Sequence, residues 1–112
     1  MRKKVLSVGT NHHDLLLMRN MVLAGAGYDV VAARSDAQAI AAISTGTIDA
    51  VIVGHSVSQA LREQIVKVAK LKRLPTVVLH AHAFEARVPD ADANLCGLDG
   101  AARIVEVLTQ LQ

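Results

Sequence analysis

The chain has 112 residues, so we expect one domain over residues 1–112 and exclude folds that need about 250 residues. Hydrophobic residues make up 52% and charged residues 20%, which is typical of a globular chain and excludes general disorder. The net charge is only +2 and aromatic residues are 2%, so a strong basic field and base-stacking surfaces are both missing. We therefore expect no nucleic-acid partner.

The chain contains one cysteine, Cys96, and no long apolar segment. One cysteine cannot form an intramolecular disulfide, which is typical of a reducing compartment. No apolar run approaches the roughly 20 residues of a membrane span, and the run after the basic start is too short for a signal peptide. We expect a cytoplasmic protein without a membrane partner.

Short apolar runs recur along the chain and predict strands. They are Val5–Val8, Val30–Ala33, Ala50–Val53 and Val77–Leu79. The runs are continuous rather than alternating and rich in β-branched residues, as in strands buried on both faces of a parallel sheet. A fifth strand is predicted at Ala93–Cys96.

The segments between the first four strands, and the C-terminal segment, are predicted to be helices. Ser35 is expected to cap the second helix, and Gly27 and Gly46 to end the first and second. The inward faces of the first, third and last helices are predicted to be Leu15, Met18, Val22 and Ala26; Leu61, Ile65 and Val68; and Ile104, Val105, Leu108 and Leu111. Residues 81–92 show no helical stripe and predict a loop. Right-handed crossovers then place helices on both faces of one sheet.

A family resemblance runs through the chain from Lys4 to about Leu111. The segments that carry it are Lys4–Val8, Asp14-Leu15-Leu16, Ala26–Val31, Ser35–Ile43, Asp49–Val53, Leu74–Leu79 and Ala91–Leu95. In their order and register they resemble the receiver domain of bacterial two-component response regulators, the CheY-like family. The resemblance implies an α/β class fold: a flavodoxin-like, three-layer α/β/α domain with five parallel strands in the order 2-1-3-4-5. The fourth helix of the family is expected to be truncated or absent.

The resemblance also locates the positions at which receiver domains bind Mg²⁺ and accept a phosphoryl group. The two acidic metal-binding positions fall on Gly9 and Thr10, and the phosphoacceptor aspartate falls on Gly54. The hydroxyl position falls on His80 and the lysine position on Gly97. Glycine supplies neither an oxygen ligand for Mg²⁺ nor a nucleophile.

These replacements predict a pseudo-receiver, which is a receiver-like signalling domain that works without phosphorylation. We expect it to act by contact with a signalling protein or a second copy of itself, with no enzymatic activity and no cofactor. The first helix is apolar around most of its circumference, so Leu17 and Met21 are predicted to remain near the surface as an interaction patch.

A small serine hydrolase is one alternative. Gly54-His55-Ser56-Val57-Ser58 nearly matches the G-x-S-x-G elbow between a strand and a helix, with Ser56 as nucleophile. Asp99 and either His80 or His82 are the candidate partners. The motif lacks its last glycine, and the simpler interpretation is that Ser56 or Ser58 caps the third helix.

A metal- or proton-sensing domain is the other alternative, because all the histidines follow predicted strands. They are His12, His13, His55, His80 and His82. Imidazoles bind Zn²⁺, Ni²⁺ or Cu²⁺, and they also gain charge near pH 6, so His13, His55, His80 and His82 are candidate ligands or sensors. Their spacing matches no defined metal motif. The basic stretch Lys67–Arg73 is expected to be a solvated helix face.

Overall fold

The computed structural model describes residues 3–9, 13–54, 57–80, 90–96 and 101–111. The elements in chain order are β1 (Lys4–Val8), α1 (His13–Gly25), β2 (Asp29–Ala33), α2 (Asp36–Ser44), β3 (Ala50–Val53), α3 (Gln59–Leu71), β4 (Thr76–His80), β5 (Ala93–Cys96) and α4 (Ala101–Leu111). Each predicted strand is present, because continuous β-branched runs suit a sheet that is covered on both faces.

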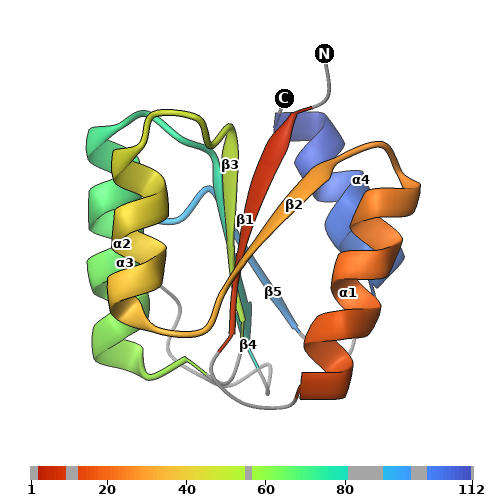
Figure 1. Ribbon diagram of the computed structural model, residues 1–112, viewed down its shortest axis with the longest axis horizontal. Coiled ribbons are helices and arrows are strands. Elements are labelled where there is room, and N and C mark those ends of the chain that lie inside the picture. The colour runs from red at the N-terminus through yellow and green to blue at the C-terminus, as the bar shows by residue number, and fades with distance from the viewer. Residues whose placement is uncertain (1–2, 10–12, 55–56, 81–89, 97–100, 112) are drawn as a thin grey trace.

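The strands form one parallel sheet in the order β2-β1-β3-β4-β5, which confirms the predicted topology (Figure 1). Val8 at the end of β1 is level with Ala33 of β2 and Val53 of β3. All carboxyl ends therefore lie at one edge of the sheet, which we call the strand-end edge. In the described part of the chain it contains Gly9, Gly54 and His80.

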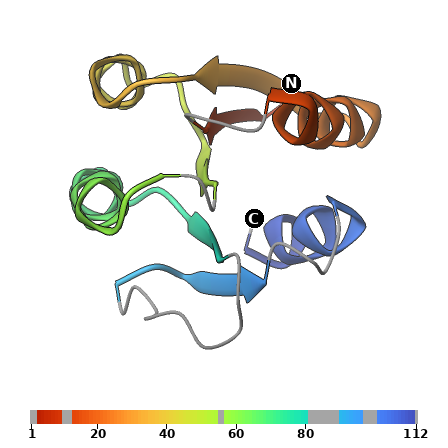
Figure 2. The same cartoon turned by 90° about the horizontal axis from the view of Figure 1, so that it is seen from below.

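Two helical layers cover the sheet, with α2 and α3 on one face and α1 and α4 on the other (Figures 1 and 2). The core under α2 and α3 includes Leu6, Val8, Ala39, Ile43, Val51, Val53, Ile65, Val66, Ala69 and Val78. The core under α1 and α4 includes Val5, Leu23, Ala50, Ile52, Val77, Leu79, Ile104, Val107 and Leu108. Both cores are aliphatic, as the composition requires, and successive residues of β3 and of Val77–Leu79 in β4 alternate between them.

The predicted inward face of α1 is wrong at Val22 and Ala26, the two positions whose side chains are described. Val22 is 40% exposed and Ala26 is exposed, whereas Leu23 is fully buried and Arg19 is only 8% exposed. The side chains of Leu15 and Met18 lie outside the described residues. The apolar pattern runs around most of this helix and defines no single face, so packing of Arg19 and Leu23 against the sheet sets its rotation.

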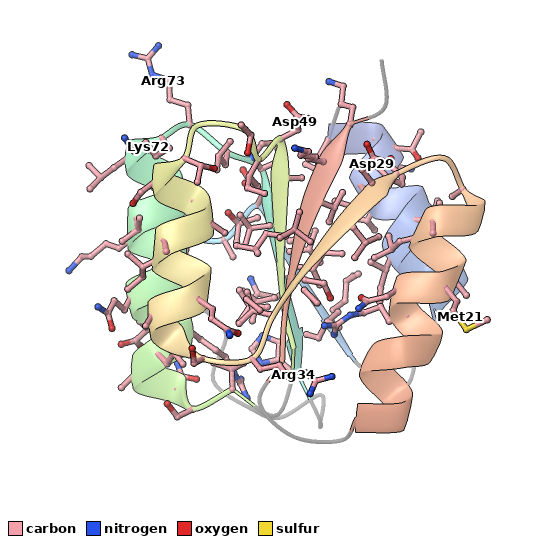
Figure 3. All side chains as sticks on the ribbon, in the orientation of Figure 1. Met21, Asp29, Arg34, Asp49, Lys72 and Arg73 are labelled. Atoms are coloured by element: carbon pink, nitrogen blue, oxygen red, sulfur yellow. The ribbon has the colours of Figure 1, made fainter. Side chains whose placement is uncertain are left out.

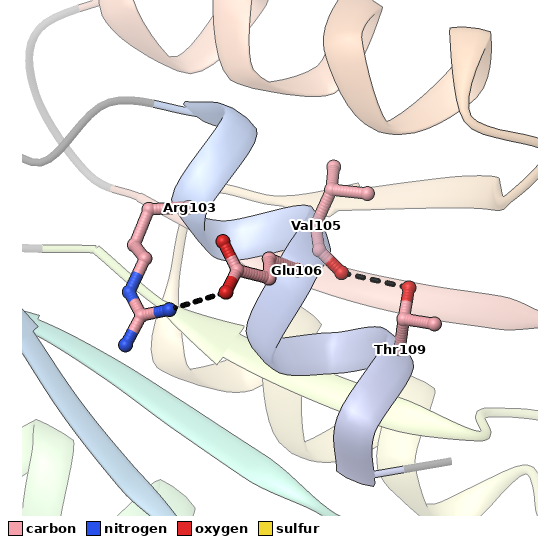
Figure 4. A network of polar contacts seen from close by, with 4 residues as sticks. All are labelled: Arg103, Val105, Glu106 and Thr109. Atoms are coloured by element: carbon pink, nitrogen blue, oxygen red, sulfur yellow. Dashed lines mark hydrogen bonds and ion pairs between the residues drawn. The ribbon is translucent and has the colours of Figure 1, made fainter.

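The α4 helix confirms two of its predicted core residues, Ile104 and Leu108, and buries Val107 as well. Val105 and Leu111 are only partly buried at the margin of the core. On the outer face of the helix, Arg103 and Glu106 form an exposed ion pair of 2.8 Å (Figure 4). An exposed pair of this kind adds little to stability.

The ends of the first two helices follow the sequence signals. The Ser35 hydroxyl accepts a hydrogen bond from the Gln38 N–H at 3.2 Å, which confirms the predicted cap of α2. After α1, Gly27 adopts a φ of 98°, and the Tyr28 N–H reaches back to the Leu23 carbonyl. This left-handed turn suits glycine, because a Cβ is strained there.

Two further predictions concern the family's fourth helix and membrane spans. The expected shortening of the family's fourth helix falls on residues 81–89, which lie outside the described residues. Among the described helices, none has both the length and the apolar character needed to cross a bilayer.

Candidate functional site

Two glycines prolong the ladder of hydrogen bonds at the strand-end edge. The Gly54 N–H donates to the Val8 carbonyl at 2.8 Å, and the Gly9 N–H donates to the Ala33 carbonyl at 3.0 Å. Both residues are buried. The edge at β1 and β3 therefore consists of tightly joined backbone.

Gly54 lies too close to its neighbours to carry a side chain without rearrangement. A Cβ at this position would lie 2.9 Å from the Val8 carbonyl oxygen and 3.2 Å from Nη1 of Arg19. The first contact is with the backbone of β1, which is hydrogen-bonded to strands on both sides and cannot easily move. Close approach of β1, β3 and the Arg19 guanidinium thus requires glycine at residue 54.

Arg19 is the cation that packs beneath this edge from α1. Its Nε and Nη2 atoms donate to the Ser7 hydroxyl at 3.1 and 2.7 Å, and Nη2 donates to the Val8 carbonyl at 3.4 Å. Ser7 is fully buried on β1. The hydrogen-bond acceptors of the guanidinium within the described part of the chain are therefore neutral oxygens rather than a carboxylate.

Burial lowers the pKa of Arg19 from its usual value to about 10, because the charged form loses its hydration. A cation with a lowered folded-state pKa destabilises the fold as long as it remains charged. Below pH 10 the folded and unfolded states are both protonated, and this destabilisation is fully present. Above pH 10 the unfolded chain binds the proton more tightly, so stability from this group rises with pH.

A second polar network joins α3, β4 and β5. The buried Arg62 donates through Nε to the Val57 carbonyl at 2.8 Å, and its Nη1 lies 3.3 Å from Nδ1 of His80. On the other side of the ring, Nε2 of His80 lies 2.8 Å from Oδ1 of Asn94. Since a guanidinium only donates, Nδ1 accepts and Nε2 carries the hydrogen that Asn94 accepts.

This network occupies the ring nitrogens of His80, which was a candidate metal ligand. Both ring nitrogens of His80 already make hydrogen bonds, so a metal at either one would displace Arg62 or Asn94. Within the described residues, no group of three or more His, Cys, Asp or Glu side chains is arranged to hold a metal ion. The other candidates, His55, His82 and the side chain of His13, lie outside the described residues.

Of the two serines in the hydrolase-like motif, only Ser58 is described by the structure. Ser58 is the N-cap of α3, and its hydroxyl accepts from the Leu61 N–H at 3.3 Å. Ser56 and the candidate partners His82 and Asp99 lie outside the described residues. The described His80 ring is oriented by Arg62 and Asn94.

Of the remaining predicted site residues, some lie outside the described part of the chain and one, Met21, lies within it. Thr10 and Gly97 lie outside the described residues, as does the side chain of Leu17. Met21 is 68% exposed and points away from the sheet (Figure 3), as predicted for the surface of α1. Its role in an interaction remains a prediction.

The basic stretch at the end of α3 is solvent-exposed, as expected for Lys67, Lys70, Lys72 and Arg73. It borders a groove of about 360 Å³ near the start of β4, lined by Lys70, Arg73, Leu74, Asp90 and Asp92. Lys70 pairs with Asp90 at 3.2 Å, and the groove carries charges of both signs. This mixed surface does not resemble a site for a polyanion.

Sequence reasoning missed the two arginines that organise the strand-end edge. Arg19 lies four residues before the buried Leu23, and Arg62 lies three residues before the buried Ile65. Each arginine thus shares a helical face with core residues. This spacing was the available signal, but a charged residue is normally assigned to the surface.

Comparison with known proteins identifies the fold. No family model and no curated protein sequence matches the chain. Among solved structures, the chemotaxis protein CheY4 of Vibrio cholerae aligns over 100% of both chains with a TM-score of 0.84 and 20% identity. A response regulator receiver protein from Sinorhizobium medicae aligns over 98% of this chain and 94% of its own, with a TM-score of 0.81 and 24% identity.

A third solved structure is the response regulator TrrA of Thermotoga maritima in complex with Mg²⁺ and BeF. It aligns over 98% of this chain and 99% of its own, with a TM-score of 0.82 and 17% identity. The chain therefore has the fold of CheY-like receiver domains. At this level of identity the likeness establishes the fold alone.

Substitution of Gly54 tests the close approach of the strands. Gly54→Ala is expected to lower the free energy of unfolding by about 1–3 kcal/mol, because the new Cβ meets the Val8 carbonyl at 2.9 Å. Gly25→Ala is the matched control: a Cβ there has nothing within 4 Å, and stability should stay unchanged or rise slightly. Urea denaturation of both variants measures the difference. Equal stability of Gly54→Ala and the wild type would contradict the crowding.

The pH dependence of stability tests the buried charge of Arg19. The reference is the double variant Arg19→Met and Ser7→Ala, which replaces both hydrogen-bonding partners by apolar groups. Relative to this variant, the wild type should gain about 1 kcal/mol of stability between pH 9 and pH 11, because its Arg19 pKa of about 10 lies below the unfolded value. Denaturant unfolding at several pH values measures the difference. A wild type that loses stability relative to the variant between pH 9 and pH 11 would contradict the predicted direction of the pH dependence.

Truncation of Ser58 tests its role as the N-cap of α3. Ser58→Ala should cost about 1 kcal/mol of stability, because the Leu61 N–H loses its acceptor. Ser58→Asp retains an acceptor and should restore most of the loss. Thermal unfolding of the two variants gives the comparison, and an unaffected Ser58→Ala protein would argue against the cap.

Proposed function

We propose that this protein is a pseudo-receiver, a signalling domain with the receiver fold that works through protein–protein contact without accepting a phosphoryl group. The observation that supports this proposal most directly is the glycine at the end of β3. By the family resemblance Gly54 stands at the phosphoacceptor position, and the structure leaves no room there for a side chain without rearrangement. Glycine offers no carboxylate for phosphoryl transfer.

The other family positions in the described residues support the same proposal. Gly9, at one of the two positions that hold Mg²⁺ in receiver domains, has no carboxylate, and its N–H is engaged by the Ala33 carbonyl. His80, at the position of the signalling hydroxyl, is buried between Arg62 and Asn94. A buried cation, Arg19, lies next to Gly54 and would further disfavour Mg²⁺ nearby.

A contact-based role without enzymatic activity follows from this chemistry. The surface of α1 offers a candidate contact, because Met21 is 68% exposed and the adjacent Val22 is 40% exposed. Contiguous exposed apolar surface is a feature of protein contacts, and these two neighbouring side chains would lie at the centre of such a surface on α1. We place the protein in the bacterial cytoplasm, as part of a two-component signalling pathway.

Treatment with a small phosphodonor tests the proposal. After incubation with acetyl phosphate and Mg²⁺, intact-mass spectrometry under denaturing conditions should show no added phosphoryl group, because Gly54 cannot accept one. A receiver domain with an aspartate at this position serves as the positive control in the same reaction. A stoichiometric mass gain of about one phosphoryl group on this protein would refute phosphorylation independence.

A further inference from the structure

The end of α3 exposes a leucine among cations. Leu71 is 82% exposed, the largest value for a large apolar side chain within the described residues. Lys67 lies one helical turn before it, and Lys70 and Lys72 flank it in the sequence; all three lysines are exposed. Since Leu71 buries little of its surface in the fold, it adds little hydrophobic stabilisation there and remains available to a partner.

Arg73 follows this helix in a conformation that suits glycine. Its φ of 57° lies in the left-handed region, and no other described non-glycine residue has a positive φ. Its N–H donates to the Lys70 carbonyl at 3.0 Å, and the next N–H, of Leu74, donates back into the last turn of the helix. An arginine here strains the backbone, and such strain points to a use for the side chain. Figure 3 shows that side chain extending outward from the end of α3.

A groove of about 360 Å³ lies beside the helix end, near the start of β4. It is lined by Lys70, Arg73, Leu74, Asp90 and Asp92. Leu74 is half-buried and supplies the apolar part of the lining. The volume lies at the lower end of the range for small-ligand sites, so the groove admits a few side chains of a partner rather than a whole folded element.

The carboxylates of the groove already have partners inside the protein. Lys70 pairs with Asp90 at 3.2 Å. Oδ2 of Asp92 accepts a hydrogen bond from the Thr76 N–H at 2.7 Å, which joins residue 92 to the start of β4. These contacts fix negative charge in the groove at positions where it would repel a uniformly acidic ligand.

The cations around Leu71 have no such partners. In the described part of the chain, no ion pair or side-chain hydrogen bond engages Lys67, Lys72 or Arg73. The helix end therefore presents an excess of positive charge beside an exposed apolar side chain. This surface is complementary to one that carries carboxylates around an apolar residue.

We propose that the end of α3 and the adjoining groove bind a short peptide segment of a partner protein, in which an apolar side chain lies between two carboxylate side chains. The apolar side chain packs against Leu71 and Leu74. The carboxylates form ion pairs with Lys72 and Arg73. Because these charges are exposed, the isolated peptide binds weakly, with a Kd on the order of 1 mM.

A protein segment fits this surface better than a nucleic acid or a membrane. Asp90 and Asp92 repel a chain of phosphates, and a phosphate backbone gains nothing from contact with Leu71. An anionic membrane attracts exposed cations, but a flat lipid surface does not enter the groove that Leu74 lines. A peptide side chain can occupy that groove while its neighbours reach the cations.

Titration of the isotope-labelled protein with a defined peptide tests the site. The probe is an acetylated and amidated peptide with the sequence Gly-Glu-Leu-Glu-Gly, and the readout is the amide NMR spectrum. Saturable shifts should be confined to residues 67–74 and 90–92, with a Kd on the order of 1 mM. Two control peptides, with serine in place of the leucine or lysine in place of each glutamate, should bind at least roughly five-fold more weakly.

Three variants at exposed positions assign the shifts to the proposed contacts. Leu71→Ser should weaken binding at least roughly five-fold, since the apolar contact is lost. Arg73→Gly should weaken binding about three-fold and raise the Tm, because glycine relieves the left-handed strain as the cation is removed. Arg103→Gln is the matched control on α4, where Arg103 pairs with Glu106, and this variant should bind like the wild type.

Three results would overturn the inference. One is the absence of saturable shifts at residues 67–74 up to a peptide concentration of about 5 mM. Another is equal binding of the peptide to the wild type and to Leu71→Ser. The third is binding to vesicles that contain phosphatidylserine without any binding of the peptide, which would make this surface a membrane contact.

The inference supplies a partner surface for the proposed contact role, and it rests on that role in taking the partner to be a protein. The two proposals fail separately. Mass spectrometry after treatment with acetyl phosphate reports phosphorylation only, whereas the peptide titration reports the end of α3 only. A protein that becomes phosphorylated and still binds the peptide would refute phosphorylation independence and support the peptide site.

Discussion

The contact between the ends of β1 and β3 is the constraint on which the strand-end edge depends. The Gly54 N–H bonds to the Val8 carbonyl at 2.8 Å, and the space of a side chain at residue 54 is limited by that carbonyl and by Arg19. A carboxylate at this point would need the strands to separate or the guanidinium to leave. The same contact therefore limits the side chain that residue 54 can carry and brings the Arg19 guanidinium next to it.

Arg19 in turn sets the rotation of α1. Its hydrogen bonds to Ser7 draw one face of the helix toward the sheet, so Leu23 enters the core and Val22 turns to solvent. The buried arginine is tolerated because its Nε and Nη2 atoms donate hydrogen bonds to oxygens of β1. The surface ion pairs Lys70–Asp90 and Arg103–Glu106 contribute little by comparison, since both are exposed.

Most of the buried polar side chains among the described residues gather near one edge of the sheet. Ser7, Arg19, Arg62 and His80 are all buried toward the strand ends, while Thr76 lies at the opposite end of β4. In parallel α/β sheets this edge is where ligands and chemistry occur. Here its described residues supply two guanidinium groups, an imidazole and two glycines, none of which offers the oxygen ligand that Mg²⁺ prefers.

The sequence by itself determined the strands, the cap at Ser35 and the turn at Gly27, because these depend on local runs, short-range hydrogen bonds and backbone conformation. The order of the strands in the sheet was implied by the resemblance to receiver domains. The sequence also located Gly54, Gly9 and His80 at one edge, since the ends of parallel strands coincide. Only the tertiary structure decided that Arg19 and Arg62 are buried and what His80 contacts. Burial of a polar or charged side chain depends on partners distant in sequence, such as Ser7 for Arg19 and Asn94 for His80. A local periodicity in the sequence does not indicate which distant residues will form these contacts.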